Sequence, residues 1–162
     1  MLKSIQSYDY QHVGDFDFKA LCDLLANESY DLAASEIKTL LKQVDLNTLP
    51  FVDDSYVRSI MVNNQHYWLG LLNWDKGAKT RIHGHPEQAF VYLVKGRLSC
   101  KNFAKETLSE LGNSDLGEGE YRYSKGVKGR VDNYIHQINA KEKSVSLHFY
   151  SDDPTKGEVF DL

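Results

Sequence analysis

The sequence predicts a mainly β protein, an antiparallel sandwich or barrel, with α-helices at its N-terminal end. From residue 51 onward, short runs rich in β-branched and aromatic residues follow one another, separated by Gly, Asn and Asp. Seven or more short strands with frequent turns are typical of antiparallel sandwiches and barrels. Before residue 51 the apolar residues instead recur at helical spacing. The chain has 162 residues, a length that suits one domain with a core of its own.

Residues 16–49 carry the helical pattern. Two apolar sets repeat at intervals of three and four residues: Phe18, Leu21, Leu24 and Leu25, then Ile37, Leu40, Leu41 and Val44. The polar stretch 27–29 ends the first helix, and Asn47 and Pro50 end the second. We expect residues 1–50 to form a helical segment that packs on a β-barrel made by residues 51–162, all within a single domain over 1–162.

The strands follow in order after the helices. They are predicted at 56–62, 66–72, 90–94, 97–103, 121–124, 131–138 and 144–151. Turn sequences separate them at 63–64, 75–77, 95–96, 112–119 ("GNSDLGEG") and 125–129. A further short strand is expected around His83 and His85.

Composition excludes several classes of function. The formal net charge is −4, and "KGVKGR" (125–130) is too short to form a basic surface, so we expect no nucleic-acid partner. No run approaches the roughly 20 apolar residues of a membrane span, and no apolar signal-peptide core opens the chain, so we expect no membrane association. Cys22 and Cys100 lack metal-type spacing, which fits a reducing cytoplasm. We therefore expect a cytoplasmic monomer.

The stretch "TRIHGHPEQAF" (80–90) contains the first candidate site. His83 and His85 stand two residues apart, so on a strand they share a face with Cα atoms about 6.5 Å apart. Both imidazoles can then reach one ion at about 2.1 Å. An isolated H-x-H is a weak signal, because the same face could simply be polar and wet.

The residues around this pair resemble the first motif of the cupin superfamily. The frame G-x5-H-x-H-x3-A-x6-G consists of Gly77, His83, His85, Ala89 and Gly96. Cupins usually carry a Glu ligand at the position of Ala89, and Glu87 has the wrong parity to replace it. The fourth ligand of the usual cupin set is therefore missing.

His136, on a predicted strand, is the candidate third ligand, at the place of the last ligand in the second cupin motif. The rest of that motif differs, because Val131 and Asn133 stand where Pro and Gly are usual and Asn139 comes one residue early. Three neutral imidazoles would leave a divalent ion with about three open positions, which favours redox or oxygen chemistry over a closed structural zinc site.

The last predicted strand, "SVSLHFYS" (144–151), carries a second polar set. Ser146, His148 and Tyr150 alternate and so share one face, while the apolar residues between them face the other side. The polar face could be solvent-exposed. If it instead faces the interior of a barrel, Tyr150 points at the metal, His148 can hydrogen-bond the phenol, and Ser146 can orient His148.

Taken together, these residues resemble the thiol dioxygenases of the cupin superfamily, in particular the cysteine dioxygenase (type I) family. The resemblance rests on "IHGH" (82–85), "HQIN" (136–139), "SVSLHFYS" (144–151), "YVR" (56–58) and "NWDKG" (73–77). It implies a cupin fold, a mononuclear non-haem Fe(II), and oxidation of the thiol of L-cysteine by O2 to cysteine sulfinate.

The resemblance also implies roles for single residues. His83, His85 and His136 would be the iron ligands. Ser146, His148 and Tyr150 would be the catalytic relay beside the iron. Arg58 would hold the substrate carboxylate, for which a guanidinium fork is well suited. Tyr56, on the same strand face as Arg58, and Trp74 would line the substrate pocket, although a core tryptophan is an equally good interpretation of Trp74.

Two departures from the family pattern leave alternatives open. Animal cysteine dioxygenases carry, at the position of Ala89, a Cys that is cross-linked to the tyrosine, and Ala89 cannot form this bond. After the tyrosine, the family's Ser-Pro-Pro is replaced by Ser151, Asp152 and Asp153, which affects the pocket shape. The alternatives are a dioxygenase for another small thiol, such as 3-mercaptopropionate, a non-catalytic cupin that binds a metal or ligand, and a cupin isomerase. Isomerases normally keep the Glu that Ala89 replaces.

Overall fold

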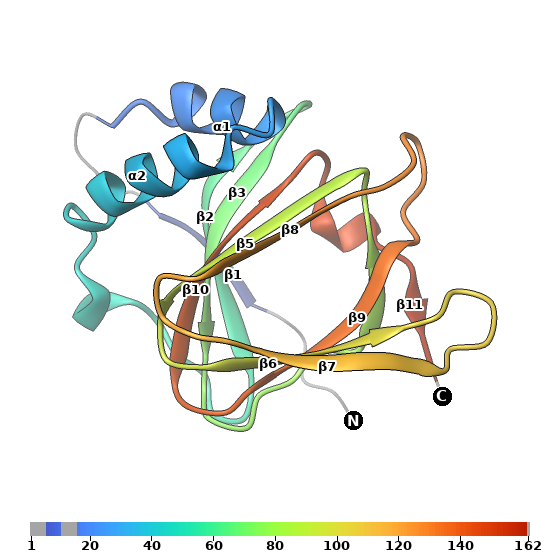
Figure 1. The fold of residues 1–162 in the computed structure, drawn as a ribbon. Coiled ribbons are helices and arrows are strands. Elements are labelled where there is room, and N and C mark those ends of the chain that lie inside the picture. The colour runs from blue at the N-terminus through green and yellow to red at the C-terminus, as the bar shows by residue number, and fades with distance from the viewer. Residues whose placement is uncertain (1–5, 11–15, 162) are drawn as a thin grey trace.

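The structure is a computed structural model that describes residues 6–10 and 16–161. Within these residues a short strand (Gln6–Asp9) precedes two α-helices, and the other strands follow, forming two sheets that face each other (Figure 1). The short strand corrects the prediction of a helical segment over residues 1–50. The predicted mainly β architecture with N-terminal helices is confirmed. No helix in this part of the chain has the length and apolar character needed to cross a lipid bilayer.

The helices α1 (Phe18–Ala26) and α2 (Tyr30–Leu41) match the predicted pattern, with one correction. The carboxylate of Asp17 accepts a hydrogen bond from the backbone N–H of Ala20 and so caps the start of α1. The predicted break at 27–29 lies between the two helices. The second helix, however, ends at Leu41. After Leu41 the backbone N–H groups of Gln43 and Val44 donate to the carbonyl oxygens three residues earlier, as in a 3-10 turn. The chain then forms the 3-10 helix η1 (Leu46–Thr48), which is capped by the side chain of Asp45.

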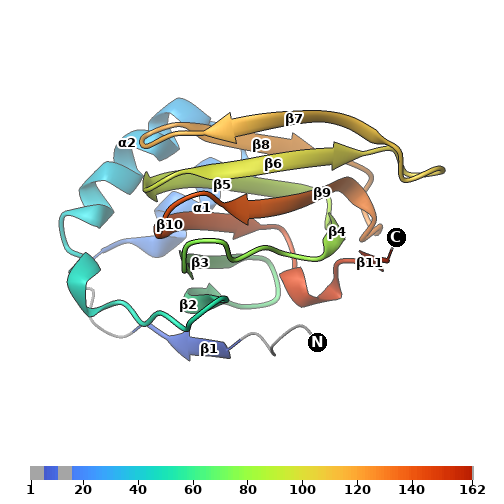
Figure 2. The ribbon, with the colours of Figure 1, turned by 90° about the horizontal axis from the view of Figure 1, so that it is seen from below.

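The strands of the described residues form one six-stranded and one five-stranded sheet. The first has the order β1 (Gln6–Asp9), β2 (Tyr56–Asn63), β3 (Trp68–Trp74), β10 (Ser144–Tyr150), β5 (Gln88–Lys95), β8 (Tyr121–Lys125). The second has the order β11 (Val159–Phe160), β4 (Ile82–His85), β9 (Asn133–Ala140), β6 (Leu98–Phe103), β7 (Glu110–Leu116). Figure 2 shows the second sheet lying across the first, with β9 between β6 and β4. The pair β1–β2 is parallel, and the other described pairs are antiparallel.

The turn predicted at 112–119 is wrong for most of this segment. Residues 110–116 form β7, an edge strand that pairs with β6 from Leu98↔Leu116 to Phe103↔Glu110. Only Leu116 in β7 is buried, so the segment has no apolar alternation from which a strand could be predicted. Its pairing with β6 supplies the structure that its own sequence does not indicate.

The two central strands, β3 and β10, are buried along their whole length and separate two apolar clusters. Leu147 on β10 and Leu71 on β3 belong to the cluster that includes the buried faces of both helices. Trp74 and Tyr150 belong to the other cluster, inside the barrel. The alternation predicted for 144–151 is thus present, and its polar residues are buried rather than solvated. Because the helices share a cluster with the sheet, they pack on it; the single domain over 1–162 stays a prediction.

Candidate metal centre and substrate pocket

Three histidines converge where β4 lies beside β9. His83 is the Cα partner of His136 across this antiparallel pair, and a register irregularity follows between His83 and His85. The ligand nitrogens of the three imidazoles all lie within 4.8 Å of one another. The structure therefore brings together the three residues that the sequence proposes as metal ligands.

Hydrogen bonds to backbone carbonyls orient two of these rings. The Nδ1 of His83 lies 2.7 Å from the carbonyl oxygen of Arg81, and the Nδ1 of His85 lies 2.8 Å from that of Tyr134. A carbonyl only accepts, so each Nδ1 carries the proton and each Nε2 keeps its lone pair. This arrangement, in which the other ring nitrogen donates to a carbonyl, is the usual one for histidines that bind metals.

The donor geometry fits one divalent ion. The Nε2 atoms of His83 and His136 are 3.2 Å apart. Two nitrogens bound to one ion at about 2.1 Å are separated by roughly 3.0–3.4 Å, so the spacing matches a shared ion. The Nδ1 of His136 is buried and has no hydrogen-bond partner among the described residues. No carboxylate or thiolate in this part of the chain joins the group, so the donor set is three imidazoles.

Burial keeps these imidazoles neutral. It lowers the pKa of His85 from 6.5 to about 3, with the neighbouring His83 adding to the effect. It also lowers the pKa values of His83 and His136. Metal binding needs the unprotonated nitrogen, so at neutral pH the three rings are in the form that binds a cation.

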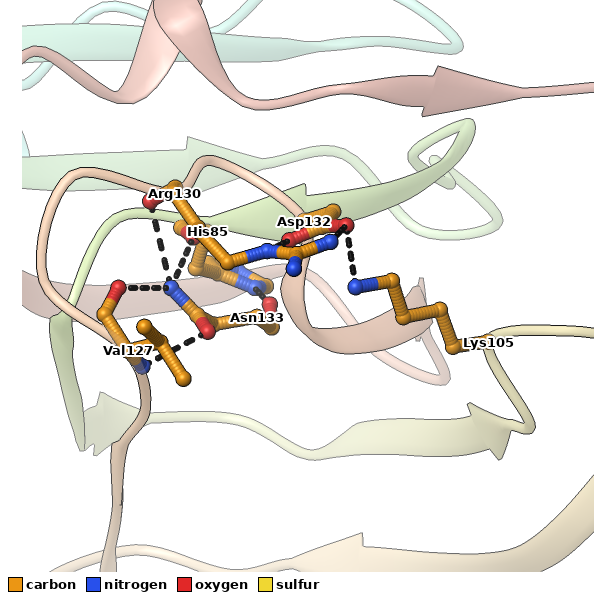
Figure 3. A network of polar contacts seen from close by, with 6 residues as sticks. All are labelled: His85, Lys105, Val127, Arg130, Asp132 and Asn133. Atoms are coloured by element: carbon orange, nitrogen blue, oxygen red, sulfur yellow. Dashed lines mark hydrogen bonds and ion pairs between the residues drawn. The ribbon is translucent and has the colours of Figure 1, made fainter.

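The side chain of Asn133 joins β4 to the loop that precedes β9 (Figure 3). Its Nδ2 lies 3.2 Å from the carbonyl oxygen of His85 and 3.1 Å from those of Val127 and Arg130, and its Oδ1 accepts from the Val127 N–H at 2.9 Å. The sequence marks Asn133 as a departure from the Gly that is usual in cupins. The structure supplies its physical reason, since this amide makes several hydrogen bonds to the loop and to β4 that a glycine could not make.

Asp132 extends the same loop structure (Figure 3). Its carboxylate pairs with Arg130 at 2.6 Å and with Lys105 at 2.5 Å. These two cations lower the pKa of Asp132 far below its ordinary value of 3.8. The loop that leads into β9, the strand that carries the backbone partner of His85, is therefore held by charged as well as neutral hydrogen bonds.

A chain of hydrogen bonds runs along the interior face of β10. The Oγ of Ser146 lies 2.6 Å from the Nε2 of His148, whose Nδ1 lies 2.9 Å from the hydroxyl oxygen of Tyr150. The indole N–H of Trp74 donates to the same Ser146 Oγ at 2.8 Å. Burial lowers the pKa of His148 to about 3 and raises that of Tyr150 well above its ordinary value. The rings of Tyr150 and His85 are stacked with centroids 5.8 Å apart, so this chain ends beside the three histidines.

A cavity of about 270 Å³ opens beside the histidines. Its walls include His83, His85, Tyr150, Arg58, Tyr56 and Trp74. Arg58 forms no ion pair within residues 6–10 and 16–161, and its positive charge acts on His83, His148 and Tyr150. Seven of the nine residues singled out from the sequence thus line this cavity, His148 among them. The other two lie behind it: His136 is grouped with His83 and His85, and Ser146 reaches the cavity only through its hydrogen bond with His148.

Comparisons with known proteins assign this arrangement to a family. The family model described as cysteine dioxygenase type I matches residues 25–161. The chain belongs to the cysteine dioxygenase type I family. In a search by sequence, no curated protein matches the chain.

Solved structures agree on the fold. A protein with a double-stranded β-helix domain from Klebsiella pneumoniae matches with a TM-score of 0.55 at 12% identity, covering 72% of this chain and 93% of the other. A cupin superfamily protein from Desulfitobacterium hafniense matches with a TM-score of 0.53 at 10% identity, covering 65% and 84%. An RmlC-like cupin from Shewanella frigidimarina matches with a TM-score of 0.52 at 13% identity, covering 70% and 92%. The predicted cupin fold is confirmed.

Within the cysteine dioxygenase fold of this chain, the mouth of the cavity contains residues that the sequence did not indicate. Arg81 lies in the wall, with its guanidinium paired to Asp161, and the segment 154–159 forms another side. Asp153 caps the short helix η2 (Pro154–Lys156) by accepting from the backbone N–H of Thr155. The Asp at 153, where the family usually has Pro, therefore shapes the mouth through a cap. Asp followed by Pro and Thr is a capping signal that a sequence search could have found.

A second, smaller cavity of about 20 Å³ lies against Ala89, His85, His136 and Tyr150. Ala89 is the Cα partner of Tyr150 across β5 and β10. Where animal cysteine dioxygenases carry the cross-linking Cys, this chain therefore has a methyl group and a small space beside the tyrosine ring.

Proposed function

We propose that this chain is a cysteine dioxygenase, which adds both atoms of O2 to the thiol of L-cysteine to give cysteine sulfinate. The observation that carries the proposal is that the neutral imidazoles of His83 and His85 share the walls of one cavity with the guanidinium of Arg58, which forms no ion pair within the described residues. The third imidazole, His136, lies against His83, with their Nε2 atoms 3.2 Å apart. Membership of the cysteine dioxygenase type I family and the three-histidine group support a metal site of the thiol-dioxygenase type.

The proposed metal is one Fe(II) per chain, held by His83, His85 and His136. Three neutral nitrogen donors and no carboxylate leave positions open for a thiol and O2 and suit iron among the metals that imidazole binds. When bound, the metal would supply the site where thiol sulfur and oxygen meet and exchange electrons. The thiol is itself the reductant, so the overall reaction needs no further cosubstrate.

The remaining residues bind and orient the substrate. Arg58 would hold the carboxylate with two parallel N–H donors, a geometry that fixes orientation as well as charge. Tyr150, at the end of the hydrogen-bond chain on β10, would donate its hydroxyl proton to the bound substrate. Tyr56 stacks on Trp74 with ring centroids 4.6 Å apart, and the two rings would form an apolar wall.

We also propose a cytoplasmic monomer. Cys22 and Cys100 are buried free thiols, the state that a reducing compartment maintains. Burial raises the pKa of Cys22 to about 12 and that of Cys100 to about 11, so neither thiol competes as a reactive thiolate.

The test is O2 consumption by the full chain after anaerobic loading with Fe(II). L-cysteine, 3-mercaptopropionate and cysteamine are compared at matched concentrations, with product identified by mass spectrometry. Fastest uptake with cysteine and formation of its sulfinate would support the proposal. Preference for 3-mercaptopropionate would make the chain a dioxygenase for another small thiol. Absence of uptake with all three thiols, with iron bound, would favour a non-catalytic cupin.

A further inference from the structure

The three metal-binding histidines differ in what their second ring nitrogen contacts. In His83 and His85 the Nδ1 atom donates to a backbone carbonyl oxygen, at 2.7 Å and 2.8 Å. The Nδ1 of His136 is buried and has no hydrogen-bond partner among the described residues. When the Nε2 of a neutral imidazole binds a cation, the single ring proton is on Nδ1. His136 then carries a buried N–H donor, which is costly to leave without an acceptor.

This nitrogen lies on the side of the small cavity beside Ala89. The Nε2 of His136 points at His83, with the two Nε2 atoms 3.2 Å apart, so Nδ1 is the ring nitrogen turned away from His83. The cavity of about 20 Å³ is lined by His136 and not by His83, whereas the substrate cavity of about 270 Å³ is lined by His83 and not by His136. The ring of His136 therefore presents its second nitrogen to the small cavity, away from the substrate.

Ser124, on the opposite sheet, brings a second polar group to the same cavity. Ser124 is the Cα partner of Ala89, which is in turn the partner of Tyr150, so the three side chains point to the same face, the interior of the barrel. The Oγ of Ser124 is buried and has no hydrogen-bond partner within the described residues. In this part of the chain four buried side-chain N or O atoms lack a partner, and two of them belong to residues that line this one cavity.

The size and walls of the cavity fit one water molecule. A water needs roughly 10–15 Å³ of such space and two to four polar partners, and this cavity has about 20 Å³. A water there can accept the Nδ1 proton of His136 and donate to the Oγ of Ser124, since a hydroxyl serves as acceptor as well as donor. Other polar groups on the walls already have partners: His148 bonds Ser146 and Tyr150.

We propose that Ser124 is a positioning residue for the metal ligand His136, acting through one water held in the small cavity between them. The water takes the place of the backbone carbonyls that orient His83 and His85, and it fixes the tautomer that leaves the Nε2 lone pair of His136 for the metal. Ala89 belongs to the arrangement, because a larger side chain at this position would occupy the space of the water. The inference rests on the three-histidine metal site and not on the identity of the metal or on thiol oxidation.

A crystal structure of the full chain loaded with Zn²⁺ tests the water directly. At a resolution that defines ordered waters, we expect a single water within hydrogen-bond distance of both the Nδ1 of His136 and the Oγ of Ser124. A dry cavity, or a direct hydrogen bond between the two side chains, would overturn the proposal.

Metal affinity tests the part played by Ser124. Loss of a group that orients a ligating histidine typically weakens metal binding 10- to 100-fold, so we expect Ser124→Ala to raise the Kd for Zn²⁺ about tenfold, measured by competition with a chelator. Ser99→Ala is the matched control, because Ser99 is also buried but its hydroxyl bonds Asn113 and does not line the small cavity. Its Kd should stay within about twofold of the wild type. An unchanged Kd in Ser124→Ala, or equal losses in both variants, would overturn the proposal.

A proton resonance separates positioning from a general loss of stability. In Zn²⁺-loaded protein labelled with 15N-histidine, long-range 1H–15N correlation reports each ring proton, and that of His136 is assigned by its proximity to the methyl group of Ala89. We expect Ser124→Ala to shift the Nδ1 proton of His136 upfield and to leave that of His85 in place, because His85 donates to a carbonyl instead.

The two readouts have to agree. A weaker Kd with an unchanged His136 proton would show that Ser124 acts by another route, and the positioning role would be overturned. If the iron-loaded wild type oxidises no thiol, the proposed function fails, while the water, the Kd for Zn²⁺ and the His136 proton still decide this inference.

Discussion

Replacing Arg58 by Gln is the sharpest single test of the proposed substrate. Arg58 is half-buried in the cavity wall and has no ion pair in the described part of the chain, so a substrate carboxylate would be its partner. Two charge-assisted hydrogen bonds would each contribute about 1.5–3 kcal/mol, and the amide of Gln restores one neutral bond of about 1 kcal/mol. The net loss is about 2–5 kcal/mol, which corresponds to a roughly 30- to 4,000-fold rise in KM for cysteine.

Cysteamine provides the matched control, because it has the amine and thiol of cysteine but no carboxylate. We expect Arg58→Gln to leave the KM for cysteamine within about twofold of the wild type, since the missing guanidinium has nothing to bind in that molecule. Steady-state O2 uptake with both thiols measures the two effects in one preparation. An unchanged KM for cysteine, or equal losses for both thiols, would refute the assignment of Arg58 to the carboxylate.

Three further predictions address the metal, the tyrosine and the pH dependence. His83→Ala should reduce bound iron by at least tenfold, measured by elemental analysis after dialysis, because one of three donors is lost. Ala89→Cys, which places a thiol in the small cavity beside Tyr150, should form a thioether during aerobic turnover, seen as the loss of two hydrogens in the peptide mass. In metal-free protein, folding keeps His85 and His148 neutral down to pH of about 3, whereas their unfolded forms take up protons below 6.5. These two rings alone make the free energy of unfolding fall by about 2.7 kcal/mol per pH unit well below pH 6. His83 and His136, whose pKa values burial also lowers, add to this fall, and urea titration measures the total.

Each of these has a control on the same chain. His66→Ala changes a histidine in the loop before β3 and should retain iron; equal retention in the position-83 variant would contradict the ligand set. Ala89→Ser adds a side chain of similar size but should give no cross-link, and a Cys variant without the mass change would show that the thiol does not reach the ring. His148→Gln removes one of the titrating rings and should lower the pH slope by about 1.4 kcal/mol per pH unit. A stability that is flat between pH 7 and 5 would contradict the burial argument.

The fold could be predicted wherever one face of an element is apolar. The alternation in 144–151 predicts β10, and the spacing of Leu21 and Leu25 predicts α1. The edge strand β7 and the two-residue β11 could not be predicted, because their hydrogen bonds come from neighbouring strands and their side chains are mostly exposed. Such strands form only because they hydrogen-bond to strands that lie elsewhere in the sequence.

In the candidate site, too, only the contacts between residues on the same strand could be predicted from the sequence. Period-two spacing places His83 beside His85, and Ser146 beside His148, because each pair lies on one strand. The contact of Trp74 with Ser146 joins residues 72 positions apart, and Asp161 reaches Arg81 across 80. No local pattern encodes those pairings, which follow from the closure of the barrel.

The amide of Asn133 also limits which residues can stand at position 126 in homologues. A Cβ at Gly126 would lie 2.2 Å from the Oδ1 and 2.3 Å from the Cγ of Asn133, so only glycine fits opposite this side chain. The two positions are therefore coupled through shared space, and a larger residue at 126 requires a smaller one at 133. In related sequences we expect Gly126 and Asn133 to occur together. Where the Gly that is usual in cupins stands at 133, we expect position 126 to vary freely.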